Sequence, residues 1–307
     1  MKKIAFQGRR GAYSESAALH LFGENVEVVP MNTFEEVFRS VESGTVDGGA
    51  IPIENSTAGS VYENFDLSYK WRLPIVAELF LQISHCLCVV PGTKIEDLRE
   101  VLSHPQGLAQ CSRFFGRHPH IKSTAFFDTA GSAEEVARRG DKSVGAIASA
   151  YAAKYYGLEV LAEGIENIPG VNYTLFYAIQ KEAISLPFAG TAAAAGNDSA
   201  GGVATAGIDS AGPVKTALIF TLQDSGKSGA LYEALGCFAK RNLNLLRIES
   251  RPHPDRPWEF IFYLSFEGNP KDPVVIEALQ ELQNVCDFVY RLGSFYEGKT
   301  VKLSYKN

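Results

Sequence analysis

The stretch VDGGAIPIENSTAGSV, residues 46–61, joins an apolar run to a cluster of polar side chains. The apolar half predicts a buried strand. Pro52 lacks an N–H and restricts the residue before it to extended geometry, so we expect the strand to end there. Ser56, Thr57 and Ser60 follow where they can cap the next helix. The stretch therefore predicts a polar edge at a strand end, where α/β proteins commonly bind ligands; a polar turn that caps itself is the alternative.

Strand and helix patterns alternate on both sides of this stretch. Residues 75–90 predict one or two long strands that cross into a second lobe. Alternation at this spacing indicates parallel sheets covered by helices, here divided into two α/β lobes with a cleft between them. Helices are expected over residues 14–22, 33–43, 61–69, 97–102, 108–117, 129–139 and 149–156, and strands over 3–7, 26–29, 46–53, 122–127, 143–147 and 172–179.

The composition changes abruptly after this part of the chain. Residues 183–213 consist largely of Ala, Gly, Ser and Thr and hold few large apolar side chains, which predicts a flexible linker. Residues 214–307 then show the order βαββαβ, which is typical of a ferredoxin-like sandwich. The expected domains are thus 1–182 and 214–307. A small sheet of this kind often pairs with a copy of itself.

Overall composition narrows the class of protein. The formal charge of −6 argues against a nucleic-acid binder, and no apolar run approaches the roughly 20 residues that span a bilayer. The first residues lack the pattern of a signal peptide, and five cysteines are an odd number for a disulfide framework, so we expect a cytoplasmic protein with reduced thiols. His85, Cys86 and Cys88 lie close together, but no second ligand pair follows at zinc-site spacing, so no metal or other cofactor is expected.

Two glycines flank two arginines in the segment Gly8-Arg9-Arg10-Gly11, just ahead of a predicted helix. This arrangement favours a site for a small carboxylate at the helix N-terminus. A turn with two solvated arginines is the alternative.

Several short motifs occur in order along the chain: FQG and GAYS at residues 6–14, PIENS at 52–56, SHPQ at 103–106 with Gln110-Cys111, DTAGSA at 128–133, NYTLF at 172–176, GAL at 229–231 and ESRP at 249–252. Taken together, they resemble those of a prephenate dehydratase with a C-terminal ACT regulatory domain. The resemblance covers nearly the whole chain except the Ala/Gly-rich segment. It implies a two-lobed, periplasmic-binding-protein-like α/β domain with a cleft, followed by a ferredoxin-like ACT domain.

The resemblance implies conversion of prephenate to phenylpyruvate with loss of carbon dioxide and water, without a cofactor. It assigns Thr174 to assist departure of the ring hydroxyl. A threonine hydroxyl is a weak acid, so we picture a donor aimed at developing charge. Glu54 is the second catalytic candidate. A carboxylate beside a dianion is repulsive unless it is protonated or turned away, so the role expected of Glu54 is to orient other site residues. The remaining residues assigned to the substrate are Ser14, Asn55, Ser56, Ser103, Gln110, Asn172 and Phe176.

One residue departs from the family pattern. The family usually has Thr-Arg-Phe where this chain has Thr174-Leu175-Phe176, so a guanidinium that could bind a carboxylate is absent. Strand alternation would place position 175 on the face opposite Thr174 and Phe176, which makes an indirect role possible. The change leaves the choice between prephenate and arogenate open, since some relatives dehydrate arogenate.

The ACT resemblance implies feedback inhibition by phenylalanine, bound between paired subunits of a homodimer or homotetramer. The residues that match ligand-contacting positions are Gly229, Ala230, Leu231, Asn244, Glu249 and Ser250. Residues 1–182 alone are then expected to keep activity and lose phenylalanine sensitivity. Besides arogenate dehydratase, a non-catalytic protein that closes on a small anion is the remaining alternative.

Overall fold

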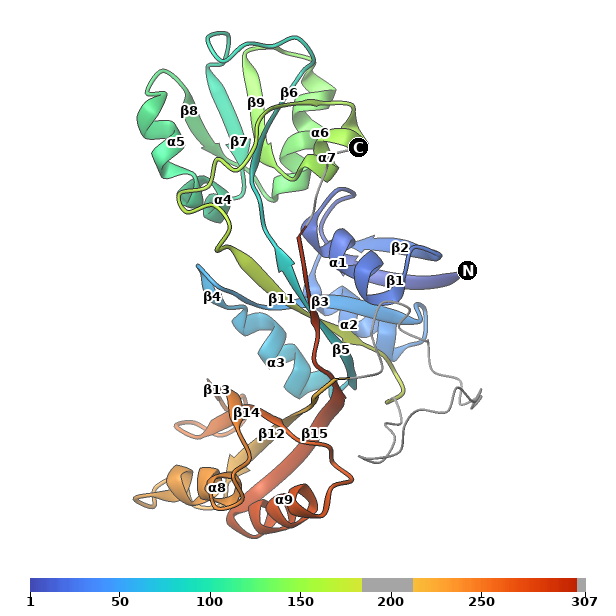
Figure 1. The fold of residues 1–307 in the computed structure, drawn as a ribbon, viewed down its shortest axis with the longest axis vertical. Helices are drawn as coiled ribbons and strands as arrows, with labels where there is room; N and C mark the ends of the chain where they lie inside the picture. The colour runs from blue at the N-terminus through green and yellow to red at the C-terminus, as the bar shows by residue number, and fades with distance from the viewer. Residues whose placement is uncertain (184–211, 303–307) are drawn as a thin grey trace.

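The computed structural model describes residues 1–183 and 212–302, so nearly all of the predicted linker lies outside the described residues. Three sheets follow one another along the long axis of the molecule, and helices pack against each of them (Figure 1). The two-lobed α/β part and the ferredoxin-like part predicted from the sequence are both confirmed. Within the described residues, no helix is long and apolar enough to cross a membrane.

The central sheet contains the start and the end of the described chain. Its order is β16 (Lys299–Val301), β5 (Ile75–Gln82), β11 (Tyr173–Ile179), β3 (Gly48–Asn55), β1 (Lys2–Gln7) and β2 (Val26–Met31), with β4 (Gly59–Ser60) beside β3. Apolar side chains fill both faces, because the core clusters on its two sides draw on the same strands. The accompanying helices are α1 (Tyr13–Phe22), α2 (Phe34–Glu42) and α3 (Tyr62–Trp71).

The second lobe is reached and left through two crossovers. The chain leaves β5, enters the second sheet at β6, and returns to the central sheet as β11, which lies between β5 and β3. This sheet has the order β10 (Glu159–Ala162), β6 (Cys86–Val89), β9 (Val144–Ala148), β7 (Glu100–Ser103) and β8 (Lys122–Ala125). Its helices are α4 (Pro105–Gln110), α5 (Ser112–Arg117), α6 (Thr129–Arg139) and α7 (Ala150–Tyr156).

The third sheet is antiparallel throughout and has the predicted βαββαβ order. Its strands lie in the order β13 (Leu245–Pro252), β14 (Phe260–Glu267), β12 (Val214–Leu222) and β15 (Cys286–Tyr296), with helices α8 (Ala230–Ala239) and α9 (Pro273–Val285). One face of the sheet packs against both helices in a separate apolar core.

Three predictions of strand pairing and helix position were wrong. The first two sheets are mixed and not parallel, because β11 and the β10–β6–β9 group pair antiparallel. Residues 97–102 were expected to form a helix, but β7 occupies residues 100–103, with Val101 and Leu102 buried between two parallel neighbours. The helix expected over 108–117 is two short helices that meet at Cys111.

The strand around Pro52 also continues past the proline, to Asn55. Its ladder with β11 shifts register where Phe176 pairs with Pro52, so this irregularity accommodates the missing N–H. The expected hydroxyl caps are absent too: helix α3 follows Val61 without a side-chain cap.

The third sheet and the central sheet share one apolar core. Ile219, Tyr263, Leu292 and Phe295 from the C-terminal part lie in the same cluster as Ile53 and other residues of the first lobe. The strand β16 then pairs in parallel with β5. The two parts are therefore joined by packing as well as by chain connectivity.

A buried ion pair lies in this junction. The Lys215 Nζ is 2.5 Å from the Glu78 carboxylate, and both side chains are less than a tenth exposed. The backbone N–H of Gly298 donates to the same carboxylate at 3.0 Å. Because the Glu78 charge is not solvated, it depends on Lys215, whose Nζ also lies 3.2 Å from the half-exposed Glu297 carboxylate.

Replacing Lys215 with methionine should therefore destabilise the protein by about 3–5 kcal/mol, since it leaves the Glu78 charge buried without its partner. The double variant Glu78→Gln/Lys215→Met removes both charges and should recover most of that loss. Chemical denaturation of the three proteins measures the difference. Equal destabilisation by the single and double variants would show that packing, and not the charge, controls the site.

Candidate functional site

A cavity of about 500 Å³ opens between the two α/β lobes. Its walls come from the ends of β1, β3 and β11, from the first crossover, and from the segments that begin helices α4 and α6. The polar residues that line it are Gln7, Tyr13, Asn55, Ser60, His85, His104, Gln106, Gln110, Asp128, Thr129 and Thr174.

Thr174 lies near the start of β11 with its side chain in this cavity, and Phe176 lines the cavity from the same face of the strand. The Thr174 Oγ1 accepts a hydrogen bond from Asn55 Nδ2 at 3.0 Å. Within the described residues, no protein acceptor takes the Thr174 proton. The hydroxyl is therefore held as an acceptor on one side and is free to donate into the cavity.

Asn55 holds this hydroxyl in place. Its Oδ1 accepts from the backbone N–H groups of Thr57 and Ala58, at 3.1 and 3.0 Å. A backbone N–H can only donate, so the atom that faces it must be the oxygen. The amide orientation is thereby fixed, and Nδ2 must face Thr174 and Asn172. Both amide groups of Asn55 thus have protein partners, one of which is Thr174, and Asn55 also lines the cavity, so its predicted hydrogen bond to substrate stays a prediction.

Gln110 and Asn172 belong to the same network. Asn172 Oδ1 accepts from Asn55 at 2.7 Å, and its Nδ2 donates to Gln110 Oε1 at 3.2 Å. Gln110 Nε2 donates to Thr57 Oγ1 at 2.8 Å, and Thr57 Oγ1 donates to Asn55 Oδ1 at 2.7 Å. These four side chains close a ring that links β3 to helix α4 of the other lobe.

His85 also contacts this ring, and the sequence reasoning assigned it no role beyond a rejected metal site. It lies in the first crossover, is 2% exposed, and has its Nε2 2.7 Å from Gln110 Oε1. A polar residue at the point where two predicted strands change lobes was the signal that could have identified it.

Four predicted substrate contacts are not among the residues that line the cavity: Asn172, described above, and Ser103, Ser56 and Ser14. Ser103 is fully buried and donates to the Ile147 carbonyl. Ser56 donates to the Val171 carbonyl and accepts from the Tyr173 N–H, so it fastens two backbone segments together. Ser14 lies in the first turn of α1 and is not among the lining residues, whereas its neighbour Tyr13 is.

Glu54 is turned away from the cavity. Its carboxylate forms an ion pair with Arg247 of β13, in the ferredoxin-like part. The cross-strand partner of Glu54 on β11 is Leu175, which is buried in the core on that same side. The residue that departs from the family pattern therefore does not remove a cation from the cavity.

The two arginines of the Gly8–Gly11 segment do not line the cavity either. Arg10 forms an ion pair with Glu15, whose side chain is fully buried, at 2.9 Å. The Gly11 N–H donates to the same carboxylate. Arg10 thus has a carboxylate of the protein as its partner, whereas Arg9 is half exposed and lies over the ring of Phe127, which lines the cavity.

The charge of the cavity wall is unusual for a site that binds an anion. Among the described residues, no lysine or arginine lines it. Its one carboxylate belongs to Asp128, which caps helix α6 by accepting from the Gly131 N–H. Burial raises the pKa of Asp128, partly offset by this hydrogen bond.

The cysteines form no candidate metal centre. Desolvation raises the pKa of the buried Cys86 and Cys111 thiols to about 12, which keeps them protonated at neutral pH. Across residues 1–183 and 212–302, no three His, Cys, Asp or Glu side chains are placed to hold a metal ion.

A second cavity, of about 270 Å³, lies at the start of helix α8. Gly229, Ala230 and Leu231 line it, and Gly229 has a φ of +85°, a conformation that favours glycine. The other three predicted effector residues lie apart from it on or beside the edge strand β13. Asn244 and Ser250 are exposed there, and Glu249 accepts from Ser60 of the first lobe.

The sequence matches a family model described as prephenate dehydratase over residues 4–184. Arogenate dehydratase/prephenate dehydratase 1 of Arabidopsis thaliana, described as chloroplastic, is 38% identical, covering 95% of this chain and 71% of that protein. Arogenate dehydratase 2 of Petunia hybrida is 39% identical over the same shares of the two chains.

Solved structures with the same overall fold cover almost the whole chain. A prephenate dehydratase from Arthrobacter aurescens in complex with L-Phe has a TM-score of 0.82 and 27% identity, over 96% of this chain and 90% of that chain. GqqA, described as a novel type of quorum quenching acylase, has a TM-score of 0.81 and 32% identity, over 96% and 98%.

Proposed function

This chain belongs to the prephenate dehydratase family, and we propose that Thr174 assists a decarboxylating dehydration in the cavity between its two lobes. The observation that carries the proposal is the Thr174 hydroxyl, which accepts from Asn55 and has its own proton free to donate into the cavity. A donor fixed in this way stabilises charge that develops on a leaving hydroxyl oxygen.

The reaction needs one such donor. The electron pair of the bond to the ring carboxylate enters the ring as carbon dioxide leaves, and the C–O bond breaks with its electrons on the oxygen. Thr174 donates a hydrogen bond to that oxygen. The hydroxide that leaves becomes water by taking up one proton, which comes from solution in the overall balance. Aromatisation of the ring drives the reaction, and the cavity wall holds the substrate in the reacting orientation.

The charge of the cavity favours arogenate over prephenate. Prephenate carries two carboxylates and no cation, whereas arogenate adds an ammonium group. A wall with the Asp128 carboxylate and neither lysine nor arginine suits a substrate that brings its own positive charge. The named plant relatives point the same way, because several are called arogenate dehydratases. The cytoplasmic location expected from the sequence remains a prediction.

The similarity to GqqA makes amide hydrolysis a second candidate activity. Hydrolysis through Thr174 as a nucleophile would require a base to accept its proton. Within the described residues, no base is hydrogen-bonded to Thr174, so its geometry favours donation.

The function is tested by steady-state turnover of purified protein with prephenate, with arogenate and with an N-acyl amide. We expect turnover of the first two, with the larger kcat/KM for arogenate. Turnover of the amide alone would instead support the acylase function. Binding without turnover of any of the three would indicate a non-catalytic binding protein.

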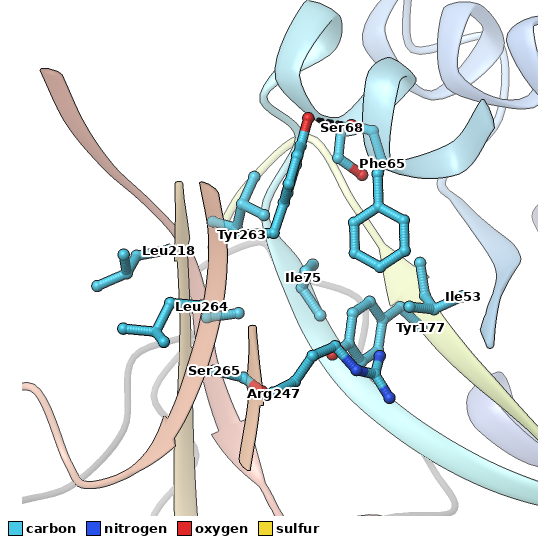
Figure 2. A pocket seen from close by; sticks show the side chains of 12 residues that line it. Ile53, Phe65, Ser68, Ile75, Tyr177, Leu218, Arg247, Tyr263, Leu264 and Ser265 are labelled. Carbon is cyan, nitrogen blue, oxygen red and sulfur yellow. Dashed lines mark hydrogen bonds between the residues drawn. The ribbon is translucent and has the colours of Figure 1, made fainter. Parts of the chain in front are cut away.

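For regulation, we propose that the ferredoxin-like part is an ACT domain that binds phenylalanine and inhibits the enzyme. Two contacts connect it to the polypeptide around the site: Arg247 pairs with Glu54, and Glu249 accepts from Ser60 at 2.7 Å. Glu54 precedes Asn55, and Ser60 lines the cavity. Figure 2 shows Arg247 beside Tyr177 and Ile53, in a small apolar space between the two parts.

The exposed Leu246 and Ile248 on edge strand β13 suit pairing with a second copy, so we propose an oligomer.

Replacing Arg247 with leucine should raise the phenylalanine concentration for half-inhibition at least about tenfold, because coupling energies of this kind are typically 1–3 kcal/mol. The basal kcat should change by no more than a few-fold. Arg251→Leu is the matched control, because Arg251 lies on the same strand but pairs with Asp66 of helix α3. Equal loss of inhibition in both variants would show that the whole interface, and not the Glu54 contact, carries the signal.

A further inference from the structure

His85 is held rigidly beside the hydrogen-bonded ring of Asn55, Asn172, Gln110 and Thr57. Its backbone N–H donates to the Glu166 carboxylate at 3.0 Å, and its carbonyl accepts from the Ile165 N–H at 3.1 Å. Its Nδ1 lies 3.5 Å from the Tyr13 hydroxyl, which is longer than an ordinary hydrogen bond, and the Tyr13 proton goes to the Ser84 carbonyl at 2.5 Å, so this contact does not require a proton on Nδ1. The imidazole is thus fixed in position and almost completely buried.

The direction of every hydrogen bond in the ring follows from the two backbone N–H groups that donate to Asn55. The N–H groups of Thr57 and Ala58 fix Asn55 Oδ1 as the acceptor, so Asn55 Nδ2 must donate to Asn172 Oδ1. Asn172 Nδ2 must then donate to Gln110 Oε1. The bond from Asn172 identifies this Gln110 atom as the amide oxygen, which can only accept, so the His85 Nε2 must carry a proton and donate to it.

We propose that His85, as the neutral Nε2–H tautomer, is a positioning residue that locks Gln110 and through the ring directs the Thr174 hydroxyl toward the substrate. This inference rests on the proposed role of Thr174 and names a residue that acts on it from a distance. Burial is the main reason that the pKa of His85 is lowered, which keeps the ring neutral at pH 7.

The opposite tautomer would reverse this effect. An unprotonated Nε2 would face Gln110 Oε1 at 2.7 Å, lone pair against lone pair. The Gln110 amide would turn over, and its bonds to Asn172 and Thr57 would be lost. Asn55 would then lose support on the side that holds Thr174.

The first test is the tautomer itself, read from the ring nitrogen shifts of protein labelled with ¹⁵N-histidine at pH 7. The Nε2–H form is expected, and either the Nδ1–H form or the imidazolium would overturn the proposal. This measurement needs no substrate and no variant, so it stands even if the protein turns over neither prephenate nor arogenate.

The second test uses variants. His85→Leu removes the donor and should lower kcat about 10- to 100-fold with KM changed less than about threefold; His85→Gln restores an N–H donor and should recover most of the rate. A change confined to KM, or no recovery with glutamine, would contradict a positioning role.

Thr57→Val interrupts the same ring at another point. The kcat of the double variant His85→Leu/Thr57→Val should therefore be about the same as that of the slower of the two single variants, because both changes break the same chain of hydrogen bonds. If the two fold-changes multiply, His85 acts independently of the ring and the proposal fails.

Discussion

Replacing Thr174 with valine is expected to lower kcat by about 10²–10⁴-fold for whichever substrate the enzyme prefers, with a small change in KM. Valine has nearly the same shape as threonine and suits a strand, so the fold should be retained. What is lost is the one hydroxyl that Asn55 presents to the cavity. Because this hydrogen bond strengthens only as the leaving oxygen gains charge, its loss appears in kcat.

Two comparisons sharpen this prediction. Thr174→Ser keeps the hydroxyl and should retain most of the activity. Thr221→Val is the matched control, since Thr221 is also a buried strand threonine but its Oγ1 lies in the ferredoxin-like part without a partner among the described residues. That variant should leave kcat unchanged. Activity of Thr174→Val within a few-fold of the parent protein would exclude the hydroxyl from the reaction.

The sequence predicted the main elements because most of them carry their own periodic pattern. Helix α6 begins and ends at the predicted residues, and the alternation of β11 correctly separated Thr174 and Phe176 from Leu175. The failure at residues 97–102 had a physical cause. Four residues of β7 are too few to show a period, and only its two parallel neighbours make that segment a strand.

The side chains of the site were harder to predict than the elements. Ser56, Ser103 and Glu54 lie close in sequence to residues that line the cavity, but a position in a strand does not determine the hydrogen-bond partner of a polar side chain. Ser103 donates to the Ile147 carbonyl, and Glu54 pairs with an arginine 193 residues away. The role of His85 depends on Gln110 in the other lobe, a contact that no local pattern encodes.

The junction between the two parts of the chain leads to the second large prediction. The sequence suggested that residues 1–182 alone would be active, but the structure gives that fragment an incomplete core. It would lose Ile219, Tyr263, Leu292 and Phe295 from the cluster they share with the first lobe. Each large apolar side chain contributes about 1.5–3 kcal/mol when fully buried. The fragment would also expose the edge of β5 and leave Glu78 without Lys215.

We therefore expect residues 1–182 to aggregate or to unfold at least about 10 °C below the full chain, with activity lost for that reason.

The matched control keeps the contacts and breaks only the connection: a protease site inserted between residues 190 and 200, cut after purification. The nicked protein should remain associated, with the thermal stability and activity of the intact chain, because packing and the β5–β16 ladder hold the parts together. A soluble, active 1–182 fragment with an unchanged midpoint would show that the shared core contributes little. Dissociation of the nicked protein into two folded parts would also show that the shared core contributes little, since the chain connection alone would then keep the parts in contact.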